Sequence, residues 1–179
     1  VFYHRSSQAS RYNRRVCVEP IHFNEDGVID EVEMTTQGAS SALDATERID
    51  AYRACLLSGE LRTASLPPSA WKGDWSEHLT RIHDGDWAAY KYVDFGEGMT
   101  AFHARAAGLA YGGTVEVHVD DPDGPPVSVC EIPHTGGWQT WATFSSPVQA
   151  PIEGVHAVYL VFRGGRHRLF DLDGFWFTA

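Results

Sequence analysis

Two neighbouring stretches of the sequence, Met99–Ala107 and Thr114–Asp120, place apolar residues at alternate positions. Successive side chains of a β-strand point to opposite faces, so this period indicates strands with one buried side and one solvent-facing side. The alternating apolar residues are Phe102, Ala104, Ala106, Val115, Val117 and Val119. Because a single strand cannot bury its apolar face, both stretches predict membership of a sheet with one covered face.

The other strand-like segments are short and are separated by turns rich in glycine, proline and aspartate. They are His78–Ile82, Trp87–Phe95, Val127–Ile132, Trp141–Phe144, Val155–Phe162 and Leu169–Phe177. Val155–Phe162 has apolar residues at both odd and even positions, so both faces of the strand are apolar. This predicts a central strand covered on both faces. About eight antiparallel strands and no long helical pattern predict an all-β fold, a β-sandwich of the jelly-roll type.

The composition limits the class of protein and its partners. A formal net charge of −10 without a basic stripe argues against nucleic acid as a partner. No run approaches the roughly 18 apolar residues that a membrane span needs. Cys17, Cys55 and Cys130 allow at most one disulfide, and each is expected to be an inert, buried thiol. The first residue is Val1, so we expect a processed chain or a piece of a longer protein.

The N-terminal part has strand character but too little of it for a core of its own. Its predicted strands are Val1–Arg5, Arg14–Phe23 and Val28–Met34. Residues 1–38 are therefore expected to be the C-terminal fragment of a larger β-domain. Small polar residues without a period predict a linker at 39–47, and the sandwich is expected at 48–179.

The segment Pro133–Trp141 joins two predicted strands and contains two tryptophans. Gly136 and Gly137 supply its turn, because glycine takes positive φ at little steric cost. Trp138 is thereby expected at the tip of the loop, where an exposed indole stacks on a flat partner such as a sugar ring or a base. The alternative, for Trp138 as for Trp141, is a place in the core.

An insertion, Leu66–Trp75, adds two further tryptophans in a loop bounded by prolines. Trp71 and Trp75 are expected to form a second contact surface, a contact with the preceding domain, or a staple that holds the loop on the sandwich.

Other motifs argue against catalysis by this chain. Paired acids such as Asp84 and Asp86 lie in turn sequences, where aspartate is favoured for backbone reasons. The nine histidines show no zinc-ligand spacing. No nucleophile elbow, phosphate loop or dinucleotide fingerprint is present.

Four blocks near the N-terminus occur in a recognisable order. They are Phe2–Arg5, Arg14–Ile21, Asn24–Gly27 and Glu31–Thr35. In this order and spacing they resemble the closing strands of the five-bladed propeller of glycoside hydrolase family 43. In that family the histidine of the first block helps to hold a metal ion near the propeller axis, which maps onto His4. The alternative is a partly exposed strand histidine. The family's three catalytic carboxylates belong to earlier blades and have no counterpart here.

Six blocks of the second unit also occur in a recognisable order. They are Asp84–Tyr90, Val93–Gly96, Gly113–Val117, Thr135–Trp141, Gly154–Phe162 and Phe170–Phe175. Together they resemble a carbohydrate-binding module of family 6, over nearly the whole of residues 48–179. The resemblance implies a jelly roll that binds plant-wall or algal polysaccharide, often xylan, in a cleft between two aromatic side chains with an asparagine beneath.

Carried onto this sequence, the resemblance assigns Trp138 to one side of that cleft. Arg81 stands where the second aromatic residue, commonly tyrosine, is expected, and Asp171 stands in place of the asparagine. A guanidinium stacks and donates hydrogen bonds but presents less apolar face than a phenol, and a carboxylate lacks the amide donor. We therefore expect Arg81 and Asp171 either to bind sugar with Trp138 or to pair with each other and close the cleft.

The same family carries a structural calcium ion between its first and last strands. The resemblance maps Asp50 and Asp173 onto two acidic ligands of that ion. Tyr52 stands where another acid is usual, so the site is short of one carboxylate. Calcium takes about six to eight oxygen ligands, so carbonyl groups and water would have to complete the site.

The expected function is non-catalytic binding of xylan- or arabinoxylan-type polysaccharide. The chain would be the C-terminal part of a secreted family 43 glycoside hydrolase, an arabinofuranosidase or xylosidase. Two alternatives stay open: a structural sandwich with a degenerate cleft that packs on the propeller, or one chain of a split, active hydrolase. The expected partners are the polysaccharide and the rest of the propeller, with neither nucleic acid nor membrane.

Overall fold

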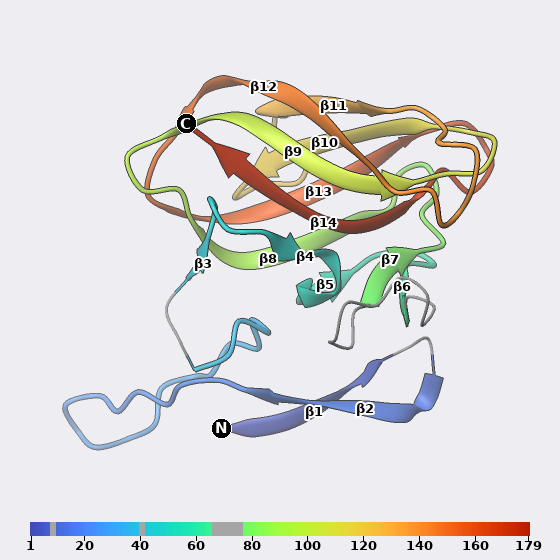
Figure 1. Ribbon diagram of the computed structural model, residues 1–179. Coiled ribbons are helices and arrows are strands. Elements are labelled where there is room, and N and C mark those ends of the chain that lie inside the picture. The colour runs from blue at the N-terminus through green and yellow to red at the C-terminus, as the bar shows by residue number, and fades with distance from the viewer. Residues whose placement is uncertain (8–9, 40–41, 66–76) are drawn as a thin grey trace.

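The computed structural model describes residues 1–7, 10–39, 42–65 and 77–179, and its regular structure is almost entirely β (Figure 1). Trp71 and Trp75 lie outside the described residues. The strands are β1 (Phe2–Ser7), β2 (Ser10–Val18), β3 (Leu43–Asp44), β4 (Ile49–Asp50), β5 (Leu56–Leu57), β6 (Arg62–Ser65), β7 (Glu77–Thr80), β8 (Trp87–Asp94), β9 (Met99–Ala107), β10 (Gly113–Val119), β11 (Ser128–Ile132), β12 (Ala142–Ile152), β13 (Val155–Gly164) and β14 (Asp171–Thr178). One turn of 3-10 helix, η1 (Ala51–Arg53), follows β4. None of the helical structure in these ranges is long and apolar enough to cross a membrane.

Two six-stranded sheets form a sandwich. One has the order β11-β10-β13-β8-β3, with β5 also paired to β8. The other has the order β12-β9-β14-β7-β6, with β4 also paired to β14. Figure 1 shows this sandwich beside a separate ribbon made of β1 and β2. The all-β, jelly-roll fold expected from the sequence is confirmed.

The principal strands lie where the hydrophobic pattern predicts them. β9 spans Met99–Ala107, and β13 lies between β10 and β8, which confirms its predicted central position. β12 differs, because it starts at Ala142 and continues through Pro147 to Ile152. Proline is tolerated there because β12 is the edge strand of its sheet, where an outward N–H has no partner to lose.

Aromatic rings fill the space between the two sheets. Tyr90 of β8 meets Phe175 of β14 edge to face, with ring centroids 4.7 Å apart. Phe177 packs against Phe95 at 4.9 Å and against Phe102 at 5.2 Å. All five side chains are fully buried. Such tilted and edge-to-face pairs are the preferred geometry of aromatic contacts, and here they hold β14 firmly in the sandwich.

The predicted strand Val28–Met34 does not form. The residues around it make one isolated bridge, between Phe23 and Ile29, and a turn closed by Asn24. The Oδ1 atom of Asn24 accepts a hydrogen bond from the N–H of Val28 at 2.9 Å. An alternating segment becomes a strand only where a partner supplies its backbone hydrogen bonds, and within the described residues β1 and β2 pair only with each other.

The sandwich begins inside the range expected to be a linker. Leu43–Asp44 forms β3, which runs parallel to β8 with Leu43 beside Val93. Leu43 and Ala45 are buried in the core. The sequence does not reveal that Leu43 and Ala45 belong to the core. They stand among small polar residues, and two apolar residues are too few to show the alternation of a strand.

A buried carboxylate joins distant parts of residues 1–38, the segment whose contact with the sandwich is here called the seam. Glu19 is only 2 % exposed. It accepts hydrogen bonds from the hydroxyl of Tyr3 (2.8 Å), the N–H and hydroxyl of Thr35 (3.0 and 2.8 Å) and the N–H of Thr36 (2.8 Å). Burial, and after it the hydrogen bond to Glu19, raises the pKa of Tyr3 well above its usual range. The phenol therefore stays a donor at all ordinary pH values.

Direct polar contacts cross the seam. They run from Arg5 to the carbonyl of Ala54 (2.5 Å), from Arg15 to the carboxylate of Glu77 (3.0 Å) and from Gln37 to the carbonyl of Tyr92 (2.5 Å). The ribbon face that carries Tyr3 and Arg5 is thereby turned toward the sandwich. The opposite face, with Phe2 and Val16, is strongly exposed.

The three cysteines are free thiols. Cys130 is buried, and Cys17 and Cys55 are partly buried. Burial raises the pKa of the Cys55 and Cys130 thiols, which lowers their reactivity as expected for inert cysteines.

Acid is expected to weaken one ion pair at the seam. The carboxylate of Glu33 accepts hydrogen bonds from the Lys91 ammonium and the Tyr92 hydroxyl, both at 2.7 Å. These bonds, that of Lys91 first, lower the pKa of Glu33. A folded-state pKa below the unfolded value of about 4.3 adds stability above that value, and this stability is lost as the pH falls through the lowered pKa.

The variant Glu33→Gln tests this pair by urea denaturation at a series of pH values. We expect it to be slightly less stable than wild type at neutral pH and equal to it in acid. The difference should be small, because the Glu33 side chain is half exposed and solvent screens the pair. A stability difference that does not change with pH would contradict the assignment.

Candidate functional site

Residues 133–141, here called the Trp138 loop, connect β11 to β12. Gly136 has a φ of +86°, the positive value that the sequence predicts for this turn. Thr135 fastens the base of the loop: its N–H donates to the carbonyl of Gly108 at 2.8 Å, and its hydroxyl accepts from the N–H of Gly108 at 3.0 Å. Trp138 is partly buried, so its indole lies neither in the core nor fully in solvent.

An arginine covers one face of this indole. The guanidinium carbon of Arg168 lies 3.7 Å from the ring centroid of Trp138. The same guanidinium donates to both carboxylate oxygens of Asp171 (2.5 and 2.6 Å) and to the hydroxyl of Thr80 (2.7 Å). Asp171 is 2 % exposed, at the start of β14. These four residues form what we call the Trp138 cluster.

Several buried side-chain nitrogen atoms around Asp171 have no hydrogen-bond partner in the described chain. They are Arg168 Nε, His78 Nδ1 and Trp141 Nε1. The other ring nitrogen of His78 lies 3.6 Å from Asp171, and its ring meets Trp141 edge-on at 5.5 Å. Buried donors are normally satisfied, so this neighbourhood suits a ligand or solvent rich in acceptor oxygens.

Arg81 does not pair with Asp171. It follows β7 with a φ of +57°, is exposed, and has no hydrogen bond or ion pair within the described ranges. The pairing that the sequence suggested as a way to close the cleft is made by Arg168 instead. In the sequence, Arg168 stands three residues before Asp171. Because the segment between β13 and β14 is an irregular turn, this spacing did not indicate that the two side chains would meet.

Asp50 and Asp173 lie together where β4 meets β14, as the family resemblance implied. Arg48 lies between them, with Nη2 3.3 Å from Asp50 and 2.9 Å from Asp173. Arg105 donates to the second oxygen of Asp173. Two carboxylates facing two guanidiniums do not fit calcium, and the described residues include no group of three or more acidic, histidine or cysteine side chains able to hold a metal.

His4 lies on the exposed face of the β1–β2 ribbon, opposite Val16 in the register. This face points away from the seam. A role for His4 at a propeller axis stays a prediction, because its metal partners would come from other blades.

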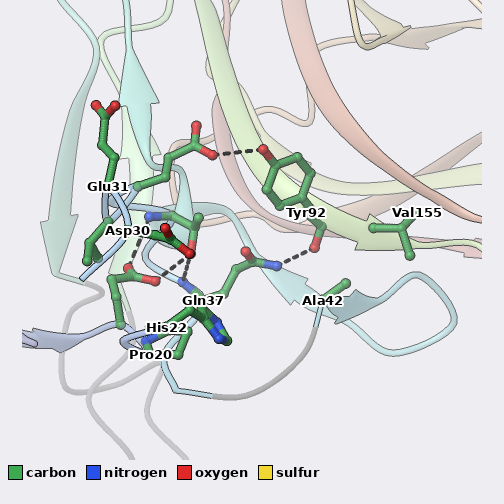
Figure 2. A pocket seen from close by; sticks show the side chains of 13 residues that line it. Pro20, His22, Asp30, Glu31, Gln37, Ala42, Tyr92 and Val155 are labelled. Carbon is green, nitrogen blue, oxygen red and sulfur yellow. Dashed lines mark hydrogen bonds between the residues drawn. The ribbon is translucent and has the colours of Figure 1, made fainter. Parts of the chain in front are cut away.

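A pocket of about 450 Å³ opens at the seam (Figure 2). Its walls combine apolar side chains with carboxylates, and they are formed by Glu19, Pro20, His22, Asp30, Glu31, Val32, Glu33, Thr35, Gln37, Gly38, Ala42, Tyr92 and Val155. Figure 2 shows Gln37 and Tyr92 turned toward each other and Glu31 pointing away. The pocket thus belongs to the contact between the ribbon segment and the sandwich, and it includes no residue of the Trp138 cluster.

Comparison with known proteins places this arrangement in a family. Residues 62–179 match the sequence model of the carbohydrate binding module, family 6. The chain belongs to this family of carbohydrate-binding modules. The solved family 6 module from Clostridium cellulolyticum in complex with xylose aligns with a TM-score of 0.68 and 33% identity, over 76% of this chain and 99% of that one.

Two hydrolases match a longer part of this chain than the isolated family 6 module does. A family 43 arabinoxylan arabinofuranohydrolase from Bacillus subtilis, solved in complex with cellotetraose, aligns with a TM-score of 0.69 and 34% identity, over 93% of this chain and 34% of that one. An arabinoxylan arabinofuranohydrolase from Paenibacillus polymyxa is 37% identical over 159 residues, 86% of this chain and 24% of the relative. This chain therefore spans about a quarter to a third of the length of these relatives.

The longer match supports both resemblances seen in the sequence. The isolated module covers 76% of the chain, whereas the family 43 hydrolase covers 93% and so reaches into the residues before the sandwich. The chain is a carbohydrate-binding family 6 module, preceded by residues that resemble the closing strands of a family 43 hydrolase.

Proposed function

We propose that this module binds xylan or arabinoxylan through the Trp138 cluster, as part of a secreted family 43 glycoside hydrolase. The observation that carries the proposal is the position of Arg168. A planar group rich in donors lies against the indole of Trp138 and donates to the buried carboxylate of Asp171. A pyranose ring offers the same features, a flat face and hydroxyl donors, so the cluster can hold a sugar in the place of the guanidinium.

Binding would exchange one set of contacts for another. The sugar ring would stack on Trp138, its hydroxyls would donate to Asp171, and Arg168, whose side chain is about one-third exposed, would turn into solvent. A ring stack contributes about 0.5–1.5 kcal/mol beyond area burial. Affinity for a single sugar is therefore modest, and tethering raises the local concentration of an attached enzyme at its polymer.

The β1–β2 ribbon would connect the module to the hydrolase. Its outer face exposes Phe2 and Val16, two large apolar side chains that a contact with a further domain would cover. The remaining blades of a family 43 propeller would pack on this face and supply the catalytic carboxylates. Arabinofuranosidase or xylosidase activity would then belong to the whole protein, and positioning on the polysaccharide to this chain.

Replacing Trp138 tests the proposed site. In native gels that contain soluble arabinoxylan or xylan, wild-type protein should migrate more slowly than in plain gels, and Trp138→Ala should lose this retardation. Arg168→Ala should be retarded more strongly, with a dissociation constant about tenfold lower, because the sugar no longer displaces a bound guanidinium. Arg163→Ala is the matched control, since Arg163 pairs with Glu116 at 3.0 Å on the other sheet.

A structural role is the second candidate function. The contact of Arg168 with Trp138 and Asp171 specifically favours it, because a guanidinium held in this way closes the site to sugar. A purely structural module predicts no retardation of wild type in either polymer. That result would reject sugar binding at the Trp138 cluster.

A further inference from the structure

We propose that the guanidinium of Arg48 replaces the calcium ion that the family resemblance implies, so that this module folds and keeps its stability without calcium. The inference concerns the junction of β4 and β14 and is independent of sugar binding at the Trp138 cluster. It rests on three features: the position of Arg48, the charge balance around Asp173, and a glycine that makes room for the arginine.

Arg48 bridges the two acids that the resemblance assigns to calcium. Its Nη2 atom lies 3.3 Å from Oδ1 of Asp50 and 2.9 Å from Oδ1 of Asp173. Asp173 is fully buried, and the Asp50 side chain is about one-third exposed. A cation is thus already present between the two carboxylates, supplied by the chain itself.

The charges around Asp173 are balanced without a metal. Arg105 donates to Oδ2, and Arg48 faces Oδ1, so Asp50 and Asp173 are matched by two permanent positive charges. A calcium ion added here would leave two excess positive charges beside a fully buried group, which is strongly unfavourable. The third acid that calcium would use is replaced by Tyr52, whose ring instead lies under Arg15 at 4.0 Å.

The contact between Arg48 and Asp173 is electrostatic more than directional. Oδ1 of Asp173 is buried and accepts no well-aligned hydrogen bond in the described chain. Its charge is therefore balanced by the nearness of Arg48. Removing that guanidinium would leave a buried carboxylate oxygen beside Asp50 with room for another cation.

A glycine on β14 gives Arg48 its place. A Cβ atom at Gly174 would lie 2.7 Å from Nε of Arg48 and 2.9 Å from the carbonyl oxygen of Ile49, closer than side chains approach. Gly174 pairs with Asp50 in the sheet. The arginine can therefore lie flat across β14 and reach both carboxylates.

Thermal unfolding with and without calcium tests the inference. We expect wild-type protein to unfold at the same midpoint in excess calcium chloride and in excess EDTA. Arg48→Ala should lower the midpoint in EDTA by about 4–8 °C, because a charge-assisted contact to a buried carboxylate is lost. Calcium should then raise the midpoint of Arg48→Ala in a saturable way, since the loss of Arg48 frees Asp50 and Oδ1 of Asp173 to bind it.

Two further variants complete the test. Arg48→Lys keeps a cation and should stay insensitive to calcium. Arg163→Ala removes an exposed arginine of another ion pair and should neither lose much stability nor respond to calcium. A wild-type midpoint that rises with calcium and falls with EDTA would overturn the proposal, and this measurement needs no variant. Failure of Arg48→Ala to respond to calcium would also contradict it.

Discussion

An Asp171→Asn variant should bind xylan about tenfold more tightly than wild-type protein while losing about 1.5–3 kcal/mol of unfolding free energy. In wild type, Asp171 holds Arg168 against Trp138 through two short hydrogen bonds. Asparagine removes the charge that fixes this guanidinium and adds an amide donor for sugar hydroxyls. Because the Arg168 side chain is already about one-third exposed, it can turn into water and uncover the indole.

Affinity and stability are measured on the same protein. Titration calorimetry with xylo-oligosaccharide gives the dissociation constant, and urea denaturation gives the unfolding free energy. Asp26→Asn is the matched control, because Asp26 is exposed in a turn near the N-terminus and should change neither quantity. A loss of stability with unchanged or weaker binding would show that Arg168 does not compete with sugar.

Replacing Glu19 with alanine should release residues 1–38 from their ordered arrangement at a cost of at least about 3 kcal/mol. Four hydrogen bonds from Tyr3, Thr35 and Thr36 end on this carboxylate. Each buried donor left without a partner costs about 1–3 kcal/mol. The core of the sandwich does not include Glu19, so β8, β9 and β14 should keep their structure.

Hydrogen exchange followed by mass spectrometry resolves this local effect. Amides of Thr35 and Thr36 and of the β1–β2 ribbon should exchange much faster in Glu19→Ala, while amides of β9 and β14 should not change. Glu31→Ala is the control, since Glu31 lines the same pocket but is exposed. Cooperative unfolding of the whole protein on loss of Glu19 would instead show that the ribbon and the sandwich form one folding unit.

These two variants address the two tasks that we propose for the chain. The Trp138 cluster concerns contact with the polysaccharide, and Glu19 concerns the segment that would join the module to the hydrolase. The cluster and the seam pocket share no residue. We therefore expect Asp171→Asn to leave exchange at the seam unchanged, and Glu19→Ala to leave retardation by xylan unchanged.

The local pattern of the sequence was sufficient for the sandwich. Alternation in Met99–Ala107 and the double-sided apolar run Val155–Phe162 predicted β9 and the central strand β13. Both predictions succeed because the period of side chains along a strand is a property of the strand itself. The turn at Gly136 was predictable for the same reason, since positive φ depends on one residue.

Pairing between distant residues could be decided only by the tertiary structure. The segment Val28–Met34 has the alternation of a strand but makes only one isolated bridge among the described residues, from Ile29 to Phe23, whereas Leu43–Asp44 lacks a pattern and still joins β8. Arg168 covers Trp138, and Arg48 lies between two acids, because loops and strands far apart in the chain converge there. A sequence shows which side chains carry charge and which segments can be strands. Which charge neutralises which is set by distances that exist only after the sheets have packed.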